Sequence, residues 1–223
     1  MRRYVFAILL GLSGAGVLVG LGVWQVQRLA WKEGILAKIE TKISADPVAL
    51  PAAPDKARDQ YLPVMIEGDF TGEGLRVLAS LKQVGAGYRM IAVFQTTNGR
   101  RILVDRGFLP IEEVDTKAAG SARIRGNLHW PEEVDSYTPA PDAATGLWFA
   151  RDVPAMAAAL KTDPVMVVTW AADPADPALI AIPVDTTHIP NDHMNYAITW
   201  FSLAAVWLGM TIYLLWRIRR RTA

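Results

Sequence analysis

The chain has 223 residues, of which 52% are hydrophobic, and its mean hydropathy is +0.19. This composition is more typical of a membrane protein than of a soluble domain. The chain has no cysteine, which excludes disulfides, thiolate metal sites, iron–sulfur clusters and cysteine nucleophiles. The 23 Lys and Arg nearly balance the 22 Asp and Glu, for a net charge of +1.

Two uncharged segments account for the high hydropathy. Residues 4–24 and 196–216 carry no charged side chain, and at 1.5 Å per residue each would form a helix about 31 Å long, close to the thickness of the hydrocarbon core of a bilayer. We predict transmembrane helices at 4–24 and at 193–216, the second with an interfacial first turn. The first is expected to be an uncleaved anchor, because its apolar run is longer than that of a signal peptide and no small-x-small cleavage site follows it.

Basic residues set the predicted orientation. Arg2 and Arg3 precede the first segment, and four arginines lie at 217–221 after the second. Basic flanks stay in the cytoplasm, so residues 1–3 and 217–223 are expected to be cytoplasmic, with residues 25–192 on the periplasmic side of a bacterial inner membrane. The two tails hold six of the 23 basic residues and none of the 22 acidic ones, which leaves the segment 25–192 at −5. That charge argues against nucleic-acid binding by this segment.

The segment 25–192 is predicted to form one folded domain. Strand-like runs lie at 61–70 and 75–82, and two more flank Asn98-Gly99, which is a strong hairpin signal. Further strands are expected at 121–130, 146–151, 164–170 and 178–184, and a short helix at 152–161, with Asp152 as its N-cap and Pro154 in its first turn. We predict an α+β membrane protein in which two transmembrane helices flank a mostly antiparallel, β-rich extracytoplasmic domain.

Small residues in the two helices suggest close packing between them. Gly16 and Gly20 are four residues apart in the first helix, and Ala205 and Gly209 in the second. This spacing permits close helix contact in lipid.

The end of the first helix carries two tryptophans and an arginine on one predicted face. Trp24, Arg28 and Trp31 are spaced i, i+4 and i+7 in GVWQVQRLAWK, residues 22–32. One interpretation is an aromatic belt with an arginine that reaches the lipid headgroups. The other is the wall of a pocket, where the indoles stack on a flat apolar ligand and Arg28 pairs with its carboxylate.

The segment PNDHMNYAITWF, residues 190–201, places polar groups directly before an apolar run. In a helix that starts near Asn191, the residues His193, Tyr196, Ala197 and Trp200 form one stripe. One interpretation is a capped helix, in which Asn191 or Asp192 accepts from free amide groups and the aromatics anchor at the interface. The other is a heme or metal site, in which the His193 imidazole ligates iron and Ala197 leaves space for the ring.

Other combinations of polar residues carry weaker signals. Asp105-Arg106-Gly107 is expected at a strand end and turn, where the charged pair either contacts a partner or forms a surface ion pair. His188 and His193 do not have a standard zinc spacing. No nucleophile elbow, Walker loop or dinucleotide loop occurs in the sequence, so we expect no enzymatic activity.

These motifs together resemble the surfeit locus protein 1 family, the assembly factors of heme-copper cytochrome c oxidase. The resemblance covers GVWQVQRLAWK, YLPVMIEGDF, GYRMIAVFQTTNGRRILVDRGFLP, IRGNL and NDHMNYAITWF. Gln25, Arg28, Trp31 and Lys32 fit the first motif, and Asn191, His193, Tyr196, Ala197, Trp200 and Phe201 fit the last. Phe108 stands where the family usually has tryptophan.

The resemblance implies a non-enzymatic chaperone of respiratory chain complex IV that binds heme a transiently and assists its insertion into the catalytic subunit of the oxidase. His193 is then the expected iron ligand, Trp24, Tyr196 and Trp200 lie beside the ring, and Arg28 meets a propionate. Heme a synthase is the expected donor. The alternative is a protein-only chaperone that stabilises an oxidase assembly intermediate without binding heme.

Overall fold

The structure, a computed structural model, describes residues 2–113, 118–142, 145–187 and 189–222. It divides into two compact units. The first comprises Met1–Lys38 with Thr186–Ala223, and the second comprises Ile39–Asp185. The first unit contains most of a long helix and the whole C-terminal helix, whereas the second contains a β-sheet.

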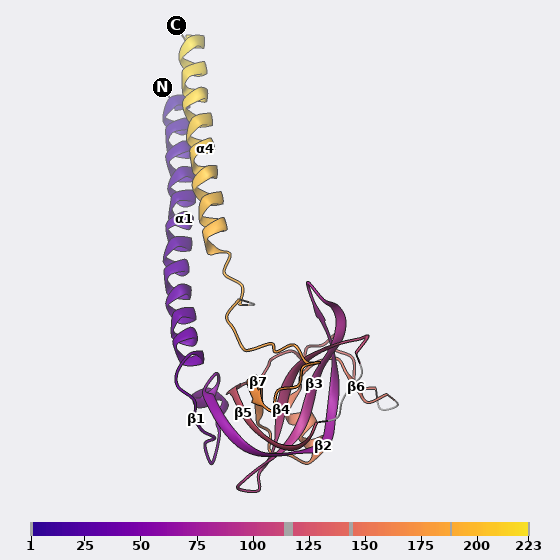
Figure 1. Cartoon of the computed structure of the whole chain (residues 1–223). Helices are drawn as coiled ribbons and strands as arrows, with labels where there is room; N and C mark the ends of the chain where they lie inside the picture. The colour runs from indigo at the N-terminus through magenta and orange to yellow at the C-terminus, as the bar shows by residue number, and fades with distance from the viewer. Residues whose placement is uncertain (1, 114–117, 143–144, 188, 223) are drawn as a thin grey trace. The chain divides into compact units, whose positions relative to one another are not determined.

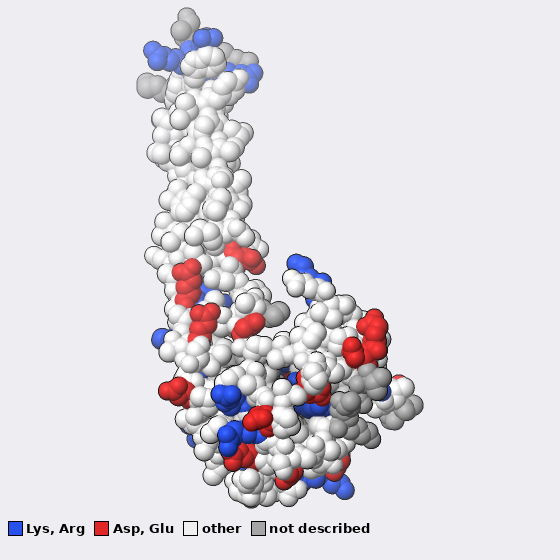
Figure 2. Space-filling view, in the orientation of Figure 1, with Lys and Arg blue, Asp and Glu red and all other residues white. Residues whose placement is uncertain are grey.

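Two long helices form the first unit. α1 spans Arg2–Ile43 and α4 spans His193–Thr222. They lie side by side and antiparallel, so that both chain ends are at the same end of the pair (Figure 1). By length and composition each is able to cross a membrane. Lysine and arginine gather at the end that carries the termini, and the helix surface next to it shows no charge on the face seen in Figure 2.

The helices pack along a seam with a seven-residue repeat. On α1 the repeat runs through Gly11, Leu18 and Gln25, and the buried Ala197 and Ala204 continue it on α4. A seven-residue repeat keeps the same residues facing the partner when two helices wrap around each other with a left-handed twist. His193 lies four residues before Ala197 and therefore belongs to this seam.

The glycines that allow close packing are not those expected. A Cβ atom added at Gly16, Gly20 or Gly209 would meet no atom within 4 Å, so the prediction that these residues form the contact is wrong. A Cβ at Gly11 would lie 2.2 Å from the Thr211 side chain, and one at Gly14 would lie 2.5 Å from that of Trp207. The seven-residue repeat explains the difference, because it places Gly16 and Gly20 outside the seam.

A single sheet forms the core of the second unit, with the path β1-β2-β3-β4-β7-β5. The strands β2 and β5 also pair with each other, and β6 pairs with β2 outside this path. The strand bounds are β1 Val48–Ala49, β2 Pro63–Leu81, β3 Gly85–Thr96, β4 Arg101–Pro110, β5 Ala119–Leu128, β6 Leu147–Trp148 and β7 Met166–Asp173. Two short helices, α2 at Lys56–Asp59 and α3 at Val153–Leu160, lie in the connections.

The sheet is mixed, so the prediction of a mostly antiparallel sheet is wrong. The pairs β2–β3, β2–β5, β3–β4 and β5–β7 are antiparallel, whereas β1–β2, β2–β6 and β4–β7 are parallel. Parallel pairing requires a long connection, and β7 reaches β4 only after the segment that contains α3. Alternating hydrophobicity identifies a strand but does not give its direction.

Several local elements agree with the sequence. The backbone N–H of Gly99 donates to the Thr96 carbonyl, and Gly99 has a φ of 84°, as a tight turn between β3 and β4 requires. The Asp152 carboxylate accepts from the Ala155 N–H and caps α3. Two expected strands at 61–70 and 75–82 are instead one strand, β2, with an irregularity between Phe70 and Gly74.

The segment expected as a strand at 178–184 is not one. Only Ile180 pairs there, through two backbone hydrogen bonds of 2.8 Å with Phe108. The side chains of Phe94, Phe108 and Ile124 are fully buried in the sheet domain.

Candidate functional site

A histidine and a glutamine from different helices contact each other at one end of the seam. The Nδ1 atom of His193, in the first turn of α4, lies 2.7 Å from Oε1 of Gln25 on α1. Gln25 is only 8% exposed, which is unusual for a polar side chain in an apolar helix pair. The two residues are 168 positions apart in the chain. The pairing of the helices creates this contact.

The hydrogen bond determines which imidazole nitrogen is able to bind a metal. A carbonyl oxygen only accepts, so Nδ1 of His193 must carry the proton in its bond to Oε1 of Gln25. In the neutral ring the lone pair is then on Nε2, which accepts no hydrogen bond from any described residue. Ligating histidines usually donate their other N–H in this way, because the bond fixes the tautomer and the ring orientation. In this tautomer Nε2 is the ring nitrogen that would be open to a ligand.

Aromatic side chains lie exposed on the two helices near this pair. Trp24 is 53% exposed and Tyr196 is 55% exposed, whereas Trp200 is half-buried. The guanidinium carbon of Arg28 lies 3.8 Å from the centre of the Trp31 ring, which confirms that these two residues share a face. Exposed rings beside a histidine fit both the binding of a flat apolar ligand and an interfacial belt.

Two details of the expected site differ in the structure. Ala197 is 2% exposed and lies in the helix seam, so it does not open space for a ring. The Oδ1 atom of Asn191 is buried and has no hydrogen-bond partner among the described residues, so it does not cap α4. His188 lies outside the described residues. The described part of the chain contains no group of three His, Cys, Asp or Glu side chains that could hold a metal ion.

A second polar cluster lies inside the sheet domain. The Asp105 side chain is fully buried in β4, where its Oδ2 atom accepts from Arg89 at 2.8 Å and from Arg151 at 3.1 Å. Its Oδ1 atom accepts from the backbone N–H of Gly107. Arg151 continues the network to Glu133, with Nε 3.0 Å from Oε1. The expectation of a strand end with a surface ion pair is therefore wrong for Asp105.

The local irregularity of β4 explains this cluster. Arg89 pairs with Phe108 and Ile91 pairs with Asp105, so two residues of β4 face one residue of β3. Gly107 has a φ of 117°, which suits a bulge and favours glycine. Burial disfavours the charged form of Glu133, but the hydrogen bonds and charge of Arg151 outweigh it and hold the pKa of the carboxyl below its usual range. Burial likewise acts to lower the pKa of Arg151, but the bonds to Glu133 and Asp105 raise it overall.

His129 lies next to this network. Its Nδ1 atom is 3.0 Å from the side-chain nitrogen of Gln60, which only donates, and its ring stacks on Tyr61 at 5.6 Å. Burial, helped by the positive charge of Arg151, lowers the pKa of His129 to about 4. His129 is therefore neutral at neutral pH.

The lowered pKa of His129 predicts a loss of stability in acid. Below about pH 6.5 the unfolded chain takes up a proton at this residue, whereas the folded chain does so only near pH 4, so the free energy of unfolding falls within that window. We expect a fall of about 2 kcal/mol between pH 7 and pH 5. Urea unfolding at both pH values measures it in the parent and in His129→Gln, where the fall should be smaller by that amount. Equal falls in the two proteins would contradict the assignment.

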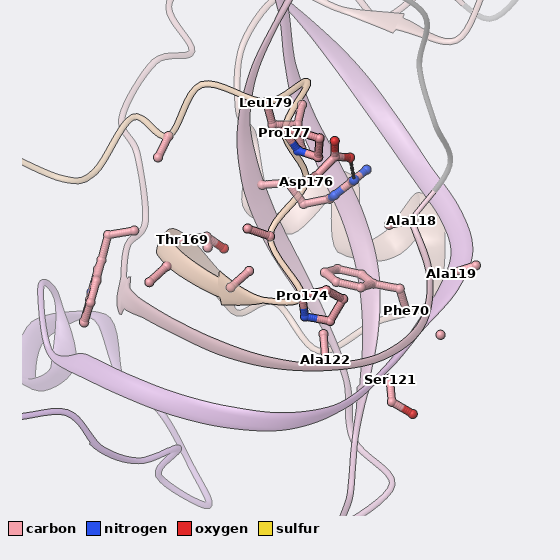
Figure 3. A pocket seen from close by; sticks show the side chains of 17 residues that line it. Phe70, Ala118, Ala119, Ser121, Ala122, Thr169, Pro174, Asp176, Pro177 and Leu179 are labelled. Atoms are coloured by element: carbon pink, nitrogen blue, oxygen red, sulfur yellow. Dashed lines mark hydrogen bonds and ion pairs between the residues drawn. The ribbon is translucent and has the colours of Figure 1, made fainter.

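The sheet domain also contains an open cavity of about 380 Å³. It lies between the first residues of β5, the end of β7 and the loop after β7 (Figure 3). Phe70 covers one side, and an ion pair of 2.6 Å joins Arg106 to Asp176 at its edge. The Oγ1 atom of Thr169 is buried there without a hydrogen-bond partner among the described residues. The lining is mainly Ala, Pro and Leu, which suits an apolar group better than a charged one.

Known proteins share the sequence over both units. The family model for the SURF1 family matches residues 13–205. A surfeit locus protein 1 from Rattus norvegicus is 29% identical over 83% of this chain and 68% of its own length. A SURF1-like protein from Monosiga brevicollis is 30% identical over 91% of this chain and 85% of its own. One from Rickettsia prowazekii (strain Madrid E) is 29% identical over 90% and 85%. The matched range includes both Gln25 and His193, and the chain belongs to the SURF1 family.

Proposed function

We propose that this protein assists the assembly of cytochrome c oxidase by binding heme a at the Gln25–His193 end of its helix pair and passing it to the catalytic subunit. Membership of the SURF1 family implies a role in cytochrome c oxidase assembly. The observation that carries the heme proposal is the hydrogen bond from Nδ1 of His193 to Gln25, which leaves Nε2 as the ligand atom. Heme a is the cargo in this proposal.

The residues around His193 fit a porphyrin in chemistry. Trp24 and Tyr196 offer exposed rings to an apolar macrocycle, and Arg28 offers a guanidinium to a propionate. Arg28 would be able to stack on Trp31 and bind a carboxylate at the same time. The Trp31 ring lies against the flat face of the guanidinium, whereas a carboxylate accepts hydrogen bonds from the N–H groups at the edge of the guanidinium. A single protein ligand to the iron suits a carrier, because a carrier must also release its cargo.

The two long helices support a membrane location for the proposed site. Both are long and apolar enough to span one. A cluster of basic residues lies at the end of the helix pair that carries the two termini (Figure 2). In a bacterial inner membrane this pattern puts the termini in the cytoplasm and His193 at the periplasmic interface. Heme a synthase would supply the heme within the same membrane, and the oxidase catalytic subunit would receive it there. In this proposal the chain ligates and releases the heme but catalyses no covalent change in it.

The second candidate is a chaperone that binds only protein. The apolar cavity beside Thr169 favours it, because an open apolar pocket on a β-domain is able to hold a segment of a partner. In that function His193 and Gln25 would serve only to join the two helices.

Complementation separates the two candidates. A strain that lacks this protein receives the parent gene, His193→Ala or Met194→Ala, and the heme a content per oxidase catalytic subunit is measured. Met194 is the matched control, because it is the neighbouring residue and is 51% exposed. We expect His193→Ala to give the heme a content of the empty strain at equal protein level, and Met194→Ala to restore it. Full restoration by His193→Ala would support the protein-only chaperone.

A further inference from the structure

An apolar groove runs along the helix pair, deeper than His193. It has a volume of about 640 Å³ and is lined by α1 between Leu10 and Leu18 and by α4 between Leu203 and Met210. Ser13 is its one polar side chain, and its hydroxyl is bound to the Leu10 carbonyl. The groove therefore offers an apolar ligand no polar partner of its own.

The groove has a rigid floor. Trp207 packs across Gly14, where a Cβ atom would lie 2.5 Å from the indole, and its Nε1 donates to the Gly11 carbonyl at 3.1 Å. The indole is thus fixed by a hydrogen bond and by contact with the opposite helix. A fixed wall of this kind favours a chain of matching shape, because dispersion contacts are lost when a gap remains.

The groove and the histidine site lie on the same side of the seam. Val17 in the groove is seven residues from Trp24, and Leu203 in the groove is seven residues from Tyr196. In helices that follow a seven-residue repeat, such pairs keep the same position relative to the partner helix. The same holds for Trp207 and Trp200. The groove therefore continues along the helix pair from the position that a ligand beside Trp24 and Tyr196 would occupy.

The distance along the helices suits one kind of occupant. Leu203 lies ten residues beyond His193, which corresponds to about 15 Å of helix, and Met210 lies about 10 Å further. A porphyrin ligated at His193 covers the first part of that distance with its own radius. A farnesyl chain on its edge, roughly 15 Å long by ordinary carbon bond lengths, covers the rest.

We infer that this groove binds the isoprenoid tail of a prenylated heme whose iron is held at His193. The inference rests on the proposed function, since it requires heme at His193. The surrounding medium is apolar in any case, so the tail gains little from leaving it. The preference for the groove arises because ring ligation tethers the tail beside it at high local concentration, and because Trp207 and Gly14 shape the floor. The groove therefore selects prenylated hemes over heme b.

Heme titration of the full chain in lipid nanodiscs tests the inference. Heme a and heme o both carry the farnesyl tail, whereas heme b carries a vinyl group instead, and their dissociation constants are measured by absorbance. We expect the parent protein to bind heme a and heme o roughly tenfold more tightly than heme b. Val17→Trp and Leu203→Trp, which fill the groove, should each reduce that ratio to about one by weakening only the prenylated hemes. Val19→Trp is the matched control, since Val19 lies outside the groove and is 41% exposed.

The outcomes distinguish this inference from the proposed function. Equal binding of heme o and heme b, or an unchanged preference in both filled variants, would overturn the tail site and leave His193 ligation intact. A groove occupied by lipid alone would give that same result. Binding of no heme at all would overturn the proposed function and this inference together.

Discussion

Asp105→Ala is expected to lower the free energy of unfolding of the sheet domain by about 3–5 kcal/mol. The Asp105 carboxylate is fully buried and accepts from two guanidinium groups, those of Arg89 and Arg151, and from the Gly107 N–H. Its removal leaves Arg89, which is only 13% exposed, without this carboxylate. It also leaves a buried N–H without an acceptor and β4 without the contact that supports its bulge.

Denaturant unfolding of the full chain in detergent measures this effect. Asp163→Ala is the matched control, because it breaks an aspartate–arginine pair of similar length, 2.8 Å to Arg100, in which the Asp163 side chain is 46% exposed. The control should cost less than about 1 kcal/mol. A cost of less than about 1 kcal/mol for Asp105→Ala would contradict this expectation. It would show that Arg151 and Glu133 stabilise β4 without the Asp105 carboxylate. Asp105→Asn keeps a hydrogen-bond acceptor but loses the charge. Its cost in unfolding free energy should therefore lie between those of Asp105→Ala and Asp163→Ala.

The second large effect concerns ligation of the heme. His193→Ala should abolish ligation of heme a, since the iron loses its protein ligand. Gln25→Leu should only weaken ligation, because Nδ1 of His193 loses the acceptor that fixes its tautomer, for which loss of metal affinity is typically on the order of tenfold. Gln25→Glu keeps an acceptor and makes it anionic, so the imidazole becomes a stronger donor and the reduction potential of the bound heme should fall.

The potential distinguishes a positioning role of Gln25 from a merely structural one. A structural role in helix packing would alter heme affinity in both Gln25 variants but would leave the potential of the heme that still binds unchanged. Addition of free imidazole to His193→Gly, where the cavity admits it, should restore the spectrum of the bound heme. No response of the potential to Gln25→Glu would contradict the positioning role.

The sequence predicted the elements that depend on local signals. An uncharged run of 21 residues identifies each long helix, Asn98-Gly99 identifies the β3–β4 turn, and Asp152 identifies the start of α3. Each of these signals lies within a few residues of the element that it specifies. Strand direction has no such local signal, because the parallel pairing of β7 with β4 depends on the long connection through α3.

The candidate site was predicted only in part for the same reason. The spacing of Trp24 and Arg28 within α1, and that of His193, Tyr196 and Trp200 within α4, made these residues candidates. The contact between His193 and Gln25 joins residues 168 positions apart and depends on the register of the two helices. The seven-residue repeat that leads through Gly11 and Leu18 to Gln25 was the available signal, and it also would have excluded Gly16 and Gly20 from the contact. The burial of Asp105 had no comparable signal, because the bulge at Gly107 is a property of two paired strands.

The visible spectrum of the purified protein tests the central claim most directly. The protein is prepared from cells that make heme a, and its spectrum is recorded beside those of His193→Ala and Met194→Ala at equal folded protein. We predict a heme a spectrum in the parent and in Met194→Ala, and its loss in His193→Ala. The same heme a spectrum in all three would contradict the assignment of His193 as the ligand. No heme a in the parent would contradict heme binding altogether and leave the protein-only chaperone as the function.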